Sequence, residues 1–205
     1  MAAEDSLSVD LPGALVPVSE HQNRSRNLVA RVRFILRQMA DADPSASEFA
    51  AHLEGRLSAL WRAEEVFARN GSDLELIILD ELETLRTPVT AMTLHGPPVQ
   101  LDPKVASVVI LAIHELATNA LKFGALGSPE GHVAITWFIS QEQAGPLLQL
   151  KWVESGVSLI ALAPRRHGFG HDLITRRIAY ELGGAGEFVW NPGGVTSLIK
   201  FPLQA

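Results

Sequence analysis

IHELATNALKFG, residues 113–124, is the stretch that decides the predicted fold. At about 100° per residue, Glu115, Asn119 and Lys122 lie at positions i, i+4 and i+7, which is one side of a helix. The opposite side is apolar and can pack on a sheet; its residues are Val109, Ile113, Leu116 and Ala120. We therefore expect the polar side to face solvent or a cleft.

An amide, a carboxylate and an amine at this spacing suit a polyphosphate that carries a hard cation. The Asn119 amide oxygen can bind Mg²⁺, the Glu115 carboxylate can hold a water or act as a base, and the Lys122 ammonium can bind phosphate oxygens. The same residue types on a helix also occur as an ordinary solvated face. The spacing alone leaves both interpretations open.

Two more motifs follow in chain order and make the pattern specific. They are WVESG, residues 152–156, and GFG, residues 168–170. With His114-Glu115 before them, they resemble the nucleotide-binding boxes of the HWE family of bacterial sensor histidine kinases, which is named for a His in the Asn-containing box and for Trp-x-Glu. The similarity runs from about Glu20 to Leu203.

The resemblance implies ATP and Mg²⁺ as cofactors and gives roles to the helix residues. Asn119 would coordinate Mg²⁺, and Glu115 would position a water or act as the base near the γ-phosphate. Lys122 and His114 would lie beside the phosphates. Glu115, His114 and Lys122 are the residues to which the resemblance gives a catalytic role.

The resemblance also implies an adenine pocket and a phosphate loop. Glu154, at the end of a strand, would accept a hydrogen bond from the adenine amino group, and Gly156 would let the backbone approach the ring. Gly168 and Gly170 precede a helix and could offer backbone amides to phosphate. Thr196, opening the last strand, would support the adenine pocket.

The N-terminal part reads as two helices. Residues 20–39 carry an apolar seam with 4-3-4 spacing, made of Leu28, Val32, Ile35 and Met39. A second amphipathic segment runs over residues 47–69, so a helical hairpin is expected. A partner hairpin from a second subunit would complete a four-helix bundle in a homodimer; the alternative is that the hairpin packs on its own C-terminal domain.

The remainder predicts a two-layer α/β sandwich of the histidine-kinase/chaperone ATPase type, which makes the whole chain α+β. We expect a capping box at Ser72-x-x-Glu75 and a helix start at Asp102-Pro103. Strands are expected at 89–94, 99–101, 132–139, 147–153, 186–190 and 196–201, with a helix over 171–182. The predicted division is a flexible leader (1–17), a helical hairpin for dimerisation and phosphotransfer (18–70) and an ATP-binding catalytic domain (71–205).

Composition excludes several classes of protein. A net charge of −6 argues against a nucleic-acid-binding protein, and the absence of cysteine excludes disulfides and thiol catalysis. Neither a signal peptide nor an apolar run of about 18 residues is present, so no membrane span is expected. We expect a cytoplasmic protein whose sensory input comes from a separate sensor protein.

The phosphoacceptor box departs from the family. That box resembles Glu-x-x-His-Arg-x-Lys-Asn, whereas this chain reads EHQNRSRN over residues 20–27, so Asn23 stands where the His is expected. An amide nitrogen is not a nucleophile, because its lone pair is delocalised into the carbonyl. His21 could substitute only if its imidazole left the side of the helix that carries the apolar seam.

Two functions therefore stay open. The first is a protein histidine kinase of two-component signalling that binds ATP with Mg²⁺ and transfers or relays phosphate to a response regulator. The second is a pseudokinase or scaffold that dimerises and binds a response regulator without autophosphorylation. An engineered change of His to Asn at position 23 would give the same sequence.

Overall fold

The computed structural model describes residues 18–43, 47–70, 72–87, 91–157 and 169–203 of the 205-residue chain. It divides into two compact units, Met1–Glu54 and Gly55–Ala205. The division falls inside helix α2 (Ser47–Asn70). The predicted leader, residues 1–17, lies outside the described residues, and the predicted functional boundary after residue 70 stays a prediction.

The first unit contains α1 (Val18–Ala42) and the beginning of α2, so both predicted helices are confirmed. Arg37 Nε donates to Glu54 Oε1 at 3.1 Å, which ties the two helices together. Leu36 and Ala50 are buried, whereas part of the predicted seam is open to solvent in the single chain: Leu28 is 64% exposed, Ile35 54% and Met39 52%.

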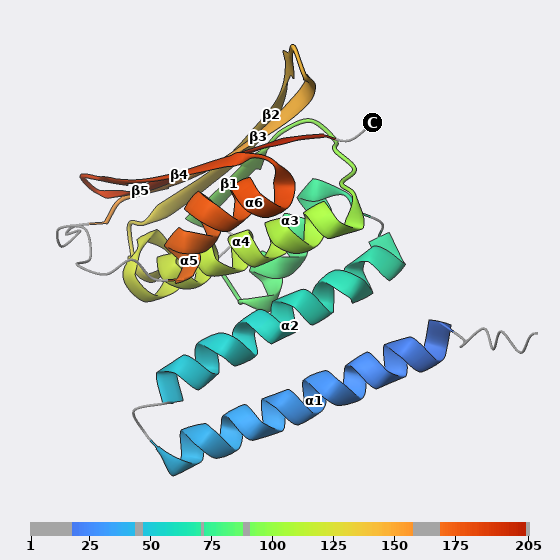
Figure 1. Cartoon of the computed structure of the whole chain (residues 1–205). Coiled ribbons are helices and arrows are strands. Elements are labelled where there is room, and N and C mark those ends of the chain that lie inside the picture. The colour runs from blue at the N-terminus through green and yellow to red at the C-terminus, as the bar shows by residue number, and fades with distance from the viewer. Residues whose placement is uncertain (1–17, 44–46, 71, 88–90, 158–168, 204–205) are drawn as a thin grey trace, which may run out of the picture. The chain divides into compact units, whose positions relative to one another are not determined.

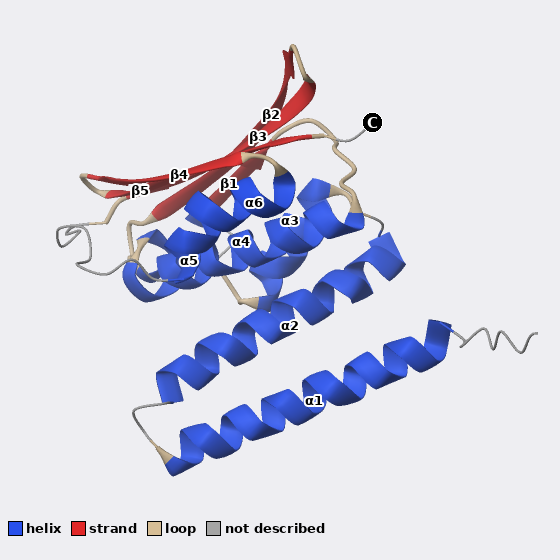
Figure 2. Cartoon of the chain, viewed as in Figure 1, coloured by secondary structure: helices blue, strands red, loops and turns tan. Residues whose placement is uncertain are grey.

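The second unit is built on a five-stranded sheet with the order β1-β2-β3-β5-β4, and only the β1–β2 pair is parallel (Figure 1). The strands are β1 (Met92–His95), β2 (His132–Glu142), β3 (Gly145–Ser155), β4 (Ala185–Asn191) and β5 (Gly194–Pro202). Helices lie on one face of this sheet (Figure 2); they are α3 (Leu74–Thr84), α4 (Pro103–Phe123), α5 (Phe169–Asp172) and α6 (Ile178–Leu182). The α+β class and the two-layer arrangement are confirmed.

Helix α4 forms the centre of the helical layer. Asp102 caps it by accepting from the Lys104 backbone N–H at 2.8 Å, and Pro103 occupies the first turn, as predicted. The predicted apolar stripe is buried throughout. By length and composition α4 could cross a membrane, but 61% of its most apolar window is buried inside the fold, which is typical of the core helix of a folded domain.

Three local predictions differ from the structure. The cap of α3 is Asp73 and not Ser72, because the Asp73 carboxylate accepts from both the Glu75 and Leu76 backbone N–H groups, at 3.0 and 3.2 Å. Residues 99–101 form no strand; they make an isolated bridge to the segment before α3. The predicted helix over 171–182 already begins at Phe169 and contains a π-helical turn, Leu173–Arg177.

Candidate nucleotide-binding site

Two of the three predicted polar residues of α4 meet a segment far along the chain, at Gly170. A Cβ atom placed on Gly170 would lie 3.2 Å from Asn119 Nδ2, 3.2 Å from Glu115 Cβ and 3.3 Å from Glu115 Oε2. Glycine thus lets the backbone of α5 approach both side chains closely. The structure therefore brings Glu115, Asn119 and Gly170 together, as one site requires.

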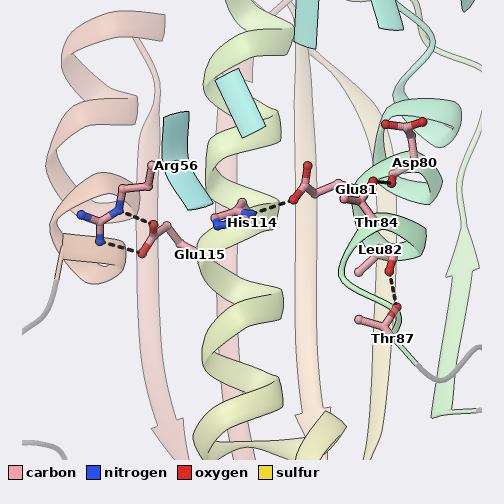
Figure 3. A network of polar contacts seen from close by, with 8 residues as sticks. All are labelled: Arg56, Asp80, Glu81, Leu82, Thr84, Thr87, His114 and Glu115. Carbon is pink, nitrogen blue, oxygen red and sulfur yellow. Dashed lines mark hydrogen bonds and ion pairs between the residues drawn. The ribbon is translucent and has the colours of Figure 1, made fainter. Parts of the chain in front are cut away.

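Glu115 is buried, and its charge is balanced by an arginine that the sequence reasoning missed. Arg56 of α2 donates from Nε to Glu115 Oε1 at 2.6 Å and from Nη2 to Oε2 at 3.2 Å (Figure 3). The fork-shaped guanidinium thereby binds both carboxylate oxygens. Because 59 positions separate the partners, no helical spacing in the sequence could have revealed the pair.

His114 points to a different neighbour from Glu115. Its side chain is 8% exposed, and its Nδ1 lies 2.7 Å from Oε1 of the buried Glu81 of α3 (Figure 3). A Cβ atom on Gly55 would lie only 2.9 Å from His114 Nε2, so α2 passes close to the other ring nitrogen. His114 therefore joins α4 to α3 and α2, and the predicted place beside phosphates does not match this orientation.

Glu154 lies at the C-terminal end of α4. Its Oε2 accepts from the Ala125 backbone N–H at 2.9 Å, and its Oε1 accepts from Trp152 Nε1 at 3.1 Å. Residues two apart on a strand face the same side, which explains the Trp-x-Glu spacing physically. Burial raises the pKa of Glu154, and the two hydrogen bonds from Ala125 and Trp152 oppose that rise. Trp152 itself is a core residue, 1% exposed.

The remaining predicted residues have different surroundings. Gly156 has φ of +77°, and a Cβ there would lie 2.1 Å from the Glu130 carbonyl oxygen, so the chain itself requires glycine at this position. The Thr196 hydroxyl accepts from Asn191 Nδ2 at 2.8 Å, a partner that the sequence reasoning did not identify. Lys122 is exposed in the last turn of α4.

Some predictions fall outside what the structure describes. Gly168 lies outside the described residues. His21 and Asn23 belong to α1, but their side chains are not among those described. Their predicted roles stay predictions.

The described site residues lie at two places along the C-terminal half of α4. Glu115 and Asn119 lie against Gly170, and Glu154 lies beside Gly124, where a Cβ would come within 2.0 Å of Glu154 Oε2. At about 1.5 Å per residue, Glu115 and Gly124 are separated by roughly 13 Å along the axis. That separation is comparable to the length of a nucleoside triphosphate.

Comparison with known proteins shows which proteins this chain resembles. Residues 20–98 match the sequence model of the family described as HWE histidine kinase. This chain is homologous to blue-light-activated histidine kinases. It is 34% identical over 142 residues to blue-light-activated histidine kinase 1 of Erythrobacter litoralis, covering 62% of this chain and 39% of that protein. It is 29% identical over 184 residues to the blue-light-activated histidine kinase of Rhizobium johnstonii, covering 89% of this chain and 52% of that protein. The chain thus spans about two fifths of the first of these relatives and about half of the second.

Solved structures agree with the fold. The Erythrobacter litoralis EL346 blue-light activated histidine kinase aligns with a TM-score of 0.55 and 14% identity, over 92% of this chain and 60% of that one. Its histidine kinase domain, solved separately, aligns with a TM-score of 0.53 and 15% identity, over 90% of this chain and 94% of that one. At this identity the likeness shows a shared fold and no residue role.

Proposed function

We propose that this HWE histidine kinase relative binds ATP with Mg²⁺ along α4, with the adenine near Glu154 and the phosphates near Glu115 and Asn119. One observation supports the proposal above the others. Glu115 and Asn119 converge on Gly170, while Glu154 lies beside the C-terminus of the same helix.

The phosphate end fits a metal-bound polyphosphate. Asn119 offers an uncharged oxygen ligand, and Glu115 offers a carboxylate that can orient a water. Gly170 keeps free the space that a Cβ would fill between these two side chains. Lys122, exposed one turn further on, can bind phosphate oxygens. When bound, Mg²⁺ would neutralise phosphate charge; His114 has no part in the proposal because its ring is turned to Glu81.

The region around Glu154 fits a hydrogen-bond donor from the adenine base. The Ala125 backbone N–H and the Trp152 indole hold the Glu154 carboxylate in one orientation. Each carboxylate oxygen can accept a further hydrogen bond, so an exocyclic amino group can still be recognised. Gly156 and Thr196 would shape the surrounding backbone and wall.

We further propose a role in two-component signalling, in which phosphate passes to a response regulator. The exposed apolar side chains of α1, Leu28, Ile35 and Met39, support a homodimer that buries them in a four-helix bundle. A cytoplasmic location remains part of this proposal.

A second candidate function rests on Asn23. If this amide stands at the phosphoacceptor position, the chain would bind ATP and a response regulator without phosphorylating itself. The protein would then act as a pseudokinase or scaffold.

Calorimetric titration with ATP and Mg²⁺ tests nucleotide binding. We expect saturable binding by the wild-type chain and at least about tenfold weaker binding by Asn119→Ala, because a metal ligand is lost. The matched control is Gln141→Ala, which removes an exposed amide at the end of β2 and should bind as the wild type does. Absence of binding by the wild-type protein would refute the proposal.

Incubation with γ-labelled ATP separates the two candidate functions. Acid-labile label that disappears in His21→Ala supports a kinase with a displaced acceptor. Retained ATP binding without label on the chain supports the scaffold.

A further inference from the structure

Two consecutive residues of α2 meet two consecutive residues of α4. Gly55 lies against His114, where an added Cβ would come within 2.9 Å of Nε2, and Arg56 binds both oxygens of Glu115. Gly55 permits the close approach of α2 to α4, and this approach brings the Arg56 guanidinium within hydrogen-bond distance of the Glu115 carboxylate. The contact therefore fixes the position of the Glu115 carboxylate from outside its own helix.

The Arg56–Glu115 pair is largely removed from water. The side chains are 15% and 6% exposed, respectively. A carboxylate this buried needs a cation or several donors, because its charge is otherwise costly to desolvate. Without the guanidinium, a full negative charge would be left at the Gly170 end of the proposed nucleotide site.

That end is the one farther from the adenine side of the proposed nucleotide site. Glu154 lies beside Gly124, and Glu115 lies roughly 13 Å away towards the N-terminus of α4. The terminal phosphate would therefore be the part of the nucleotide that lies nearest to Glu115. ADP lacks that phosphate.

We infer that Arg56 is a positioning residue of the terminal-phosphate end: it holds the Glu115 carboxylate in place and cancels its charge, so that the site accepts ATP in preference to ADP. The inference rests on the proposed ATP binding. It adds a residue of α2 to a site otherwise built from α4, α5 and β3.

The ratio of ATP to ADP affinity, each with Mg²⁺, tests the inference by titration calorimetry of four proteins. Relative to the wild type, Arg56→Gln leaves one extra negative charge, Glu115→Gln leaves one extra positive charge, and the double substitution leaves none. We expect the ratio to fall roughly fivefold in Arg56→Gln, to rise in Glu115→Gln, and to return to within about threefold of the wild type in the double variant. A merely structural role of Arg56 cannot produce a return of the ratio in the double variant.

Two further variants serve as controls. Arg37→Gln removes the more exposed ion pair between Arg37 of α1 and Glu54 of α2, and should leave the ratio unchanged. Arg56→Lys keeps the charge and should keep most of the ratio. If Arg56→Gln does not fold, comparing Glu115→Gln with the double variant still isolates the removal of Arg56. The ratio of ATP to ADP affinity should then be lower in the double variant than in Glu115→Gln.

The outcomes are distinguishable from failure of the proposed function. No nucleotide binding by the wild type would refute ATP binding itself. Wild-type binding of both nucleotides with the same ratio in all four proteins, or equal losses for ATP and ADP in Arg56→Gln, would overturn the role of Arg56 alone.

Discussion

Replacing Glu81 by alanine should be among the most destabilising single changes in the second unit. Glu81 is 1% exposed and its Oε1 lies 2.7 Å from His114 Nδ1, which is also buried. The substitution leaves the imidazole without this partner and opens a cavity in the layer between α3 and α4. Both consequences lower the free energy of unfolding.

The magnitude follows from the burial of the pair. Removing one partner of a buried, hydrogen-bonded pair typically costs about 3–5 kcal/mol. For a unit of this size, each kcal/mol shifts the unfolding midpoint by about 2–4 °C, so we expect a decrease of roughly 10 °C. Because two apolar groups of similar shape leave no polar atom unsatisfied, combining Glu81→Met with His114→Leu should recover most of that loss.

Thermal unfolding followed by circular dichroism measures the effect. Glu83→Ala is the matched control, because Glu83 lies on the same helix but is exposed; it should change stability by no more than about 0.5 kcal/mol. If Glu81→Ala unfolds at the same temperature as Glu83→Ala, the buried pair does not contribute to stability as reasoned.

Three further predictions concern single positions. Gly55→Ala should destabilise by about 1–2 kcal/mol in urea unfolding, because its Cβ would lie 2.9 Å from His114 Nε2; an increase in stability, as helix propensity alone predicts, would contradict the close contact. Asp102→Ala should cost about 1 kcal/mol in the same assay, because the Lys104 N–H loses its cap, and Asp102→Asn, which keeps the acceptor, should restore most of it. Burial raises the pKa of Glu154, so between the ordinary glutamate pKa and the raised one the folded state holds a proton that the unfolded state has released, and stability should fall as pH rises through that range. Unfolding midpoints measured across the acidic range should show this slope in the wild type and lose it in Glu154→Gln. An unchanged slope in Glu154→Gln would assign the pH dependence to another group.

Periodicity and capping chemistry were enough to predict much of the fold. The helical spacing gave the boundaries of α1, α2 and α4 within a few residues, and Asp102-Pro103 marked the start of α4. Turn residues placed the β2–β3 and β4–β5 hairpins, whose antiparallel pairing the structure confirms. These features depend on residues close together in the chain.

The tertiary partners could not be predicted in the same way. Arg56 and Glu81 lie 59 and 33 positions from the residues they bind, and no local pattern marks either as a partner. For His114 the difficulty was angular: it precedes Glu115 by one residue, so their side chains leave the helix about 100° apart and only one can face Gly170. His114 and Glu115 are adjacent in the sequence, but their side chains lie in different surroundings.

The hydrogen bond between the Trp152 indole and Glu154 gives the protein a built-in optical probe. The indole is buried, and its N–H lies 3.1 Å from a carboxylate oxygen, so the local field at the ring changes when that carboxylate gains a proton or a new donor. In a variant whose other three tryptophans, Trp61, Trp137 and Trp190, are replaced by phenylalanine, emission from this single ring would follow events at Glu154 without an added dye.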